Sequence, residues 1–206
     1  MQKCKKILFV VSEDWYFLTH RFDLAKVATK KGYKIALLSN FSEYRKKIEK
    51  EGIQTFDWGI SRKNFDFVNE IKSLFKLYLT IKHFNPEIIH AVSLKTSVLT
   101  SIITYFVNNK KNIYAISGLG YIFTSKKITA KFIKFLLLIV MRILKSNKSK
   151  IIVQNPEDKK ILLNYNISKK ENIILIKGVG VDLKKFSPKK NDNKKIKVFL
   201  GTRLLK

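Results

Sequence analysis

The residues with the clearest potential for chemistry surround a stretch that reads ISGLGY, from Ile116 to Tyr121. An apolar run precedes it and a long helical pattern follows it, which predicts a strand, a turn and a helix. In an open parallel sheet, ligands bind beyond the carboxyl ends of the strands, and small residues there let a ligand approach the backbone. We therefore predict that this turn contacts a ligand through Ser117, Gly118, Leu119, Gly120 and Tyr121. A tight turn without a ligand is the alternative, because the third glycine of the dinucleotide fingerprint is missing.

Two further polar residues follow the apolar run that begins at Glu87. His90 lies near the predicted end of that strand, where it is either a catalytic histidine or a hydrogen-bonded core residue. Lys95 lies at a predicted helix start, where an anion contact and a solvated lysine are the two interpretations. We expect His90, Lys95 and Ser117 to converge at the carboxyl ends of neighbouring strands.

Charged residues also follow the first predicted strand. His20 and Arg21 open a predicted helix, where the helix dipole disfavours cations, so they are further candidates for ligand binding. An exposed helix charge is the alternative for both. Glu13 and Asp14 are expected to form a solvated turn, with a general base as the less favoured interpretation. No Cys/His spacing indicates a metal site, and the sequence predicts neither a metal nor a cofactor.

Apolar runs and amphipathic patterns alternate along the chain and must position these residues. Strands are predicted at Lys6–Val11, Tyr33–Leu38, Gly52–Phe56, Glu87–Val92, Ile113–Ile116, Lys150–Gln154 and Asn172–Ile176. Helices are predicted at Thr19–Lys31, Glu43–Lys50, Asn64–His83, Thr96–Val107, Ile128–Ser146 and from Asn155-Pro156 onward, with a loop over Ser12–Leu18. In the third helix, Phe67, Ile71, Leu74, Leu77, Tyr78 and Ile81 recur at helical spacing. This alternation predicts an α/β fold with a doubly wound, Rossmann-like parallel sheet.

The polar run KKNDNKK divides the end of the chain from the rest. We expect one domain over residues 1–188, a linker over 189–195, and the start of a second domain over 196–206. A strand at Ile196–Leu200 without a following helix cannot bury its faces alone, so we expect this second domain to be truncated.

The formal net charge is +27, and no Asp or Glu occurs between Ile88 and Pro156. Such a one-sided charge indicates an anionic partner. Five basic residues share a stripe of one predicted helix: Lys127, Lys131, Lys134, Arg142 and Lys145. We expect this stripe to meet anionic phospholipid headgroups, with a solvated basic face as the alternative. The apolar run in that helix is too short to span a membrane.

Five segments in order carry a resemblance to a known family. They are FLTHRFDLAKVATKKGYKI from Phe17, IIHAVSLKTS from Ile88, AISGLGYIFTS from Ala115, IIVQNPEDKKIL from Ile151 and IKGVGVDLKKFSP from Ile176. Together they resemble the N-terminal half of a family-four glycosyltransferase with the GT-B fold, of the bacterial branch that builds surface polysaccharides and lipid-linked oligosaccharides. This resemblance covers almost the whole chain.

The resemblance implies a function and a location. Such enzymes transfer a sugar from a nucleotide-sugar to an acceptor, here a lipid-linked saccharide, with the acceptor held by the N-terminal domain. It implies a cytoplasmic protein that is peripheral on the inner face of the cell membrane. Arg203 matches the arginine that contacts the donor diphosphate. Because the chain is expected to stop before the donor domain is complete, we expect it to be inactive alone.

Departures from the family pattern leave the catalytic residue open between His90 and Ser117. Many relatives carry a glycine pair where this chain has Ser12 to Tyr16, and histidines where Val92 and Ser117 stand. Two other functions therefore stay open: a stand-alone binding module for an anionic lipid-linked sugar, and a nucleic-acid-binding protein. The last is the least favoured, since neither a groove-entering helix nor stacking aromatics on a sheet face is evident.

Overall fold

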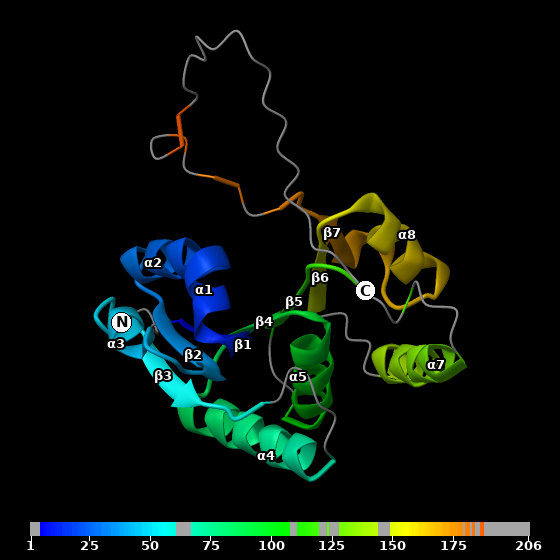
Figure 1. The fold of residues 1–206 in the computed structure, drawn as a ribbon, viewed down its shortest axis with the longest axis horizontal. Coiled ribbons are helices and arrows are strands. Elements are labelled where there is room, and N and C mark those ends of the chain that lie inside the picture. Colours follow the sequence, from blue (N-terminus) through cyan, green and yellow to red (C-terminus); the bar gives the residue numbers. More distant parts are fainter. Residues whose placement is uncertain are drawn as a thin grey trace, which may run out of the picture.

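The computed structural model describes residues 5–60, 67–107, 111–119, 123, 128–143, 149–178, 180–181, 183 and 186–187 (Figure 1). Its strands are β1 (Lys6–Glu13), β2 (Lys34–Asn40), β3 (Gln54–Asp57), β4 (Ile88–Val92), β5 (Lys111–Ile116), β6 (Ser149–Val153) and β7 (Ile173–Leu175). Its helices are α1 (Asp14–His20), α2 (Phe22–Lys30), α3 (Arg45–Glu49), α4 (Phe67–Phe84), α5 (Leu94–Val107), α7 (Ile128–Ile143), α8 (Pro156–Asn164) and a short 3₁₀ turn at Lys170–Asn172.

The strands form one parallel sheet in the order β3-β2-β1-β4-β5-β6-β7. The chain builds outward from β1 to β3 and then returns to the other side of β1 with β4. This reversal is the topological switch point, where an open α/β sheet leaves a crevice at the carboxyl ends of its strands. The predicted doubly wound, Rossmann-like fold is confirmed.

Helices lie on both faces of the sheet and bury a hydrophobic cluster on each (Figure 1). On one face, α1, α2 and α3 contribute Phe17, Phe22 and Ile48 to a cluster over β1 and β2. On the other face, α4, α5, α7 and α8 cover the sheet. The central strand β1 is buried from Leu8 to Val11 because it is covered on both sides. This explains its uninterrupted apolar sequence.

The connection after β1 differs from its prediction. The expected loop over Ser12–Leu18 is wrong: β1 continues to Glu13 and α1 begins directly at Asp14. The single helix expected over Thr19–Lys31 is two helices, which change direction at Arg21. The expected solvated turn is also wrong for Asp14, which is completely buried.

The buried side of α4 was only partly predicted. Leu77 and Ile81 of the predicted stripe face the core, but Phe67 is 69% exposed and Ile71 is 51% exposed. The remaining buried positions are polar or terminal, namely Glu70, Ser73, Thr80 and Phe84. The indole Nε1 of Trp58 donates to the carbonyl oxygen of Ser73 at 3.0 Å, which holds this side of α4 against the core.

The other boundaries agree with the predictions to within a few residues. Helix α8 begins as predicted, with Asn155 as its N-cap: the backbone N–H of Asp158 donates to Asn155 Oδ1 at 2.7 Å. The predicted linker, 189–195, and the predicted second domain, 196–206, lie outside the described residues, as does Arg203.

Candidate functional site

A crevice opens at the switch point, beyond the carboxyl ends of β1, β4 and β5. It has a volume of about 140 Å³ and is lined by Ser12, Tyr16, Ile60, Val92, Ser93, Lys95, Thr96 and Ser117. We call it the switch-point crevice. Four of its residues carry hydroxyl groups of serine or threonine, Tyr16 adds an aromatic ring, and Lys95 adds a positive charge. This mixture of small polar groups with one aromatic ring suits a ligand that is rich in hydroxyl groups.

Strained backbone forms one wall of the crevice. Ser93 has φ 105°, a conformation that disfavours residues with a side chain. Its backbone N–H donates to the carbonyl oxygen of Ala115, and its own carbonyl oxygen accepts from the N–H and the hydroxyl of Ser97. These hydrogen bonds hold the turn between β4 and α5 in its strained conformation. The strain therefore persists at the end of the sheet where ligands bind.

Tyr16 of α1 adds an aromatic ring to the lining of the crevice. The rings of Tyr16 and His20, one turn apart on α1, are stacked with their centroids 4.0 Å apart. The helix begins next to the crevice because Asp14 anchors it: its carboxylate accepts hydrogen bonds from the N–H and hydroxyl of Ser42 and from the N–H of Trp15. Asp14 is thus a buried positioning residue, a role that the sequence pattern did not reveal.

A buried acid reaches the edge of the crevice from α4. Lys95 Nζ forms an ion pair with Glu70 Oε1, and the side chain of Glu70 is only 9% exposed. Sequence reasoning missed Glu70, because the acid precedes the acid-free stretch and lies far from the turn. A signal was present: Glu70 is the one acid in the sequence of α4. Lys95 is therefore held by a carboxylate beside the crevice.

The expected convergence of three residues is only partly found. Lys95 and Ser117 both line the switch-point crevice, but His90 does not. Its side chain lies within the face of the sheet, two residues before the end of β4, where its ring stacks on Phe9 with centroids 5.2 Å apart. The expectation that His90 shares one site with Lys95 and Ser117 is therefore wrong.

His90 instead lines a second cavity, of about 220 Å³, together with His20, Arg21, Leu24, Ile152, Gln154, Ile176 and Gly178. We call it the Arg21 cavity. Burial lowers the pKa of His90 from 6.5 to about 3, with the positive charge of Arg21 as a smaller cause. A base with so low a pKa takes up protons weakly near pH 7. The environment of His90 thus argues against general-base catalysis.

The glycine turn contributes less to the crevice than predicted. Ser117 lines it, whereas Leu119 is buried in the core, and Gly118 is half-buried without being among the lining residues. Gly120 and Tyr121 lie outside the described residues.

Two members of the predicted basic stripe contact Tyr165 of the loop after α8. Lys134 Nζ lies 4.8 Å from the centroid of the Tyr165 ring, and Arg142 Nε donates to the Tyr165 carbonyl oxygen at 2.7 Å. Lys127, Lys145 and the side chain of Lys131 lie outside the described residues. Contact of the stripe with phospholipid stays a prediction.

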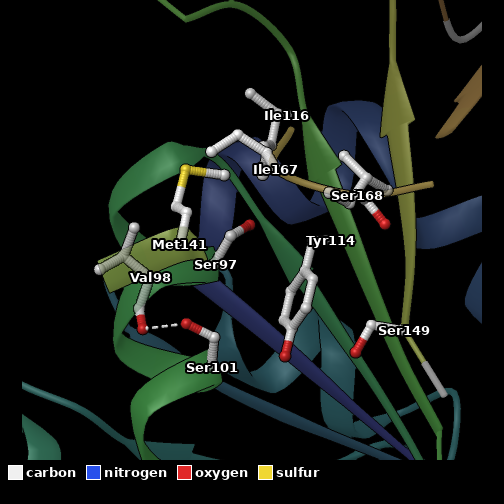
Figure 2. A pocket seen from close by; sticks show the side chains of 10 residues that line it. Ser97, Val98, Ser101, Tyr114, Ile116, Met141, Ser149, Ile167 and Ser168 are labelled. Carbon is white, nitrogen blue, oxygen red and sulfur yellow. Dashed lines mark hydrogen bonds between the residues drawn. The ribbon is translucent and has the colours of Figure 1, made fainter. Parts of the chain in front are cut away.

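A third, smaller cavity of about 40 Å³ lies between α5, β5, β6 and α7. Figure 2 shows the side chains that line it. Ser97 and Ser101 of α5 line it with Tyr114 of β5 and Met141 of α7. Tyr114 OH lies 3.2 Å from Thr104 Oγ1, and burial raises the pKa of Tyr114. The surface of the cavity is mostly apolar and its volume is far smaller than that of the other two cavities, so we interpret it as a gap in the packing of these elements and not as a reactive site.

In the part of the chain that the structure describes, His, Cys, Asp and Glu side chains do not gather in groups of three or more that could hold a metal ion. Among the same residues, no helix is both long enough and apolar enough to cross a membrane.

Comparison with known proteins relates this geometry to one family. A family model described as Glycosyl transferase 4-like matches residues 6–155. A relative from Campylobacter jejuni, the N,N'-diacetylbacillosaminyl-diphospho-undecaprenol alpha-1,3-N-acetylgalactosaminyltransferase, is 22% identical over 157 residues. The match covers 76% of this chain and 42% of the relative.

Solved structures share the fold. A glycosyltransferase from Rickettsia africae matches with a TM-score of 0.60 and 19% identity, over 89% of this chain and 45% of that one. HepE from Anabaena, solved in complex with UDP and glucose, matches with a TM-score of 0.58 and 14% identity, over 87% and 46% of the two chains. The chain thus spans less than half the length of each of these relatives.

Proposed function

The chain belongs to the glycosyl transferase 4-like family, and from this we propose that it forms the acceptor-binding part of a glycosyltransferase. The observation that carries the proposal is the switch-point crevice, where serine and threonine hydroxyls, Tyr16 and the Lys95–Glu70 pair surround one opening. Saccharides are bound by such groups, since hydroxyls exchange hydrogen bonds and aromatic rings pack on sugar faces. The strained turn at Ser93 supports the same assignment.

The names of the relatives suggest the substrates. The Campylobacter jejuni relative is named for transfer of N-acetylgalactosamine to a saccharide on undecaprenyl diphosphate. HepE was solved with UDP and glucose. We propose a nucleotide-sugar as donor and a lipid-linked saccharide as acceptor, in the synthesis of a surface polysaccharide or glycan. The donor would bind to a second domain, and the predicted diphosphate contact of Arg203 belongs to that part of the proposal.

In the proposed reaction, a hydroxyl of the acceptor attacks the anomeric carbon of the donor sugar. The bond from that carbon to the diphosphate breaks, and the nucleoside diphosphate leaves with the electron pair and takes up the proton that the acceptor hydroxyl loses. The described residues contribute by orientation: the crevice would fix the acceptor hydroxyl at the edge that faces the donor. Ser117 is proposed as an acceptor contact. His90 is not proposed as the base, because of its pKa of about 3 and its position outside the crevice.

Steady-state kinetics of a fusion enzyme test this proposal. The chain would be joined to the second half of the Campylobacter jejuni relative, and Ser117→Leu would be compared with the fused wild type. We expect the KM for the acceptor to rise about tenfold, because the added side chain occupies the crevice, while the KM for the donor is unchanged. Asn164→Leu, at an exposed position of α8, serves as the matched control.

Two outcomes would count against the proposal. If Ser117→Leu had normal acceptor kinetics, the acceptor would have to bind elsewhere. If the fusion bound acceptor without transferring sugar, the stand-alone binding module would become the better assignment.

We also propose that the protein meets an anionic membrane surface through α4. Its outward side exposes Phe67, Ile71, Phe75 and Leu79, spaced four residues apart. Lys72, Lys76 and Lys82 are exposed on the same helix, whose single acid, Glu70, is buried. An apolar stripe flanked by lysines is the pattern of helices that lie in a membrane interface. This surface fits a lipid-linked acceptor, whose saccharide is presented at the membrane.

A further inference from the structure

Two buried cationic or polar side chains of the Arg21 cavity have incomplete hydrogen bonding. Arg21 is 9% exposed and His90 is 6% exposed. Among the described residues, neither Arg21 Nε nor His90 Nε2 has a hydrogen-bond partner. Buried nitrogen atoms are rarely left in this state, and a bound ligand or water is the usual reason for an exception.

The charge of the cavity is unbalanced. Arg21 Nη1 donates to the carbonyl oxygen of His20 at 2.8 Å, and none of the residues that line the cavity is Asp or Glu. Burial lowers the pKa of Arg21, because the guanidinium loses water without gaining a counter-ion. An isolated buried charge is costly unless an opposite charge accompanies it. An anion in the cavity would supply that charge.

The start of α2 lies at Arg21, the residue that also ends α1. Arg21 is the N-cap of this nine-residue helix, and no side chain caps its first turn. Leu24, in the first turn, also lines the cavity. The unpaired N–H groups of a helix N-terminus attract anions, and the buried guanidinium lies at the same end.

All the residues that line the cavity come from four of the five segments that carry the family resemblance. His20, Arg21 and Leu24 belong to the first segment, and His90 belongs to the second. Gln154 belongs to IIVQNPEDKKIL, and Gly178 belongs to IKGVGVDLKKFSP. Segments far apart in the sequence thus meet around one cavity.

We propose that the Arg21 cavity is an anion site that binds a diphosphate group, with Arg21 as its main charged ligand. A guanidinium matches the paired oxygens of a phosphate with parallel hydrogen bonds. The cavity is larger than the switch-point crevice and shares no lining residue with it: Tyr16 lines the crevice, and His20, whose ring stacks on Tyr16, lines the cavity. This site goes beyond the proposed function and does not depend on what the crevice binds.

Isothermal titration calorimetry of the purified 206-residue chain tests the site, with inorganic pyrophosphate as the probe in 150 mM salt. Because the chain carries a net charge of +27, non-specific binding must be measured beside it. Arg21→Gln is therefore compared with Lys26→Gln, which removes one positive charge from the exposed side of α2. Thermal melts check that both variants fold.

We expect Arg21→Gln to weaken pyrophosphate binding at least tenfold and Lys26→Gln to weaken it less than twofold. Leu24→Trp, which fills the cavity from a half-exposed position, should weaken binding as Arg21→Gln does. Equal effects of Arg21→Gln and Lys26→Gln, or unchanged binding by Leu24→Trp, would overturn the proposal. UDP and farnesyl diphosphate distinguish the source of the diphosphate: tighter binding of UDP indicates a nucleotide, and tighter binding of farnesyl diphosphate indicates a lipid carrier.

Discussion

Individual residues of this protein owe their properties to neighbours that are distant in the sequence. His90 is neutral because Phe9, Arg21 and the rest of the sheet face enclose it. Lys95 is held by Glu70, which α4 brings from 25 positions away. The sequence identified Lys95 and Ser117 as candidates, because both follow predicted strands. The sequence could not show that His90 differs from these two residues. His90 lies only two residues before the end of β4, and this small shift places its side chain on the covered face of the sheet and not at the sheet end.

The pKa of His90 predicts a pH dependence of stability. The unfolded chain binds a proton near pH 6.5, whereas the folded chain resists protonation down to about pH 3. The contribution of His90 to the free energy of unfolding is therefore fully present above pH 6.5. It is lost as the pH falls from 6.5 towards 3. The slope approaches about 1.4 kcal/mol per pH unit.

Denaturant unfolding between pH 7 and pH 4.5 measures this slope. His90→Asn should reduce the slope of the free energy of unfolding against pH by up to about 1.4 kcal/mol per pH unit. This reduction is expected whatever the stability of the variant at pH 7. His83→Asn, at an exposed histidine of α4, is the matched control. The same slope in wild type and His90→Asn would contradict a buried neutral imidazole.

The strain at Ser93 predicts an unusual order of stabilities. Glycine adopts a φ of 105° freely but also lacks the Ser93 hydroxyl, so relief of strain offsets the lost hydrogen bond and Ser93→Gly should stay within about 1 kcal/mol of wild type. Ser93→Ala keeps the strain and loses the hydroxyl oxygen that accepts from the Thr96 N–H, so it should lose about 1 kcal/mol. Urea unfolding gives the order, and a Ser93→Gly variant less stable than Ser93→Ala would refute the assignment of strain.

At the scale of elements, hydrophobic periodicity located most helices and strands but not always their orientation. In α4, apolar residues occur on nearly every side, so spacing alone cannot choose the buried face. The hydrogen bond from Trp58 to Ser73 and the ion pair from Lys95 to Glu70 choose it. The early start of α1 was missed for a similar reason, because it depends on the hydrogen bonds between Asp14 and Ser42, which is distant in the sequence.

The exposed side of α4 predicts binding to vesicles. Ile71→Gln combined with Phe75→Gln should reduce partition onto anionic vesicles at least about tenfold, because two large apolar side chains no longer enter the interface. Vesicle sedimentation measures the effect. Val27→Gln combined with Ile174→Gln, at two exposed apolar positions of α2 and β7, is the control. Equal losses in both double variants would indicate general adsorption of a basic protein.

At the scale of the molecule, the alternation of strands and helices was sufficient to predict the parallel sheet and its doubly wound order. The crevice followed from that order, because β4 returns beside β1 at the switch point. The Arg21 cavity did not follow from it, since its residues come from two helices, two strands and three connections, between α1 and α2, after β6 and after β7. Only the folded chain brings them together.

The most direct test of the central claim is to locate the bound acceptor on the folded chain. A short-chain lipid diphosphate saccharide with a photoreactive diazirine on its terminal sugar would be irradiated with the protein, and adducts would be mapped by mass spectrometry. We predict adducts on peptides that contain Ser12–Tyr16, Ser93–Thr96 or Ser117, which unlabelled acceptor prevents and Ser117→Leu reduces. Adducts concentrated away from the switch-point crevice, or insensitive to Ser117→Leu, would contradict the assignment of the acceptor site.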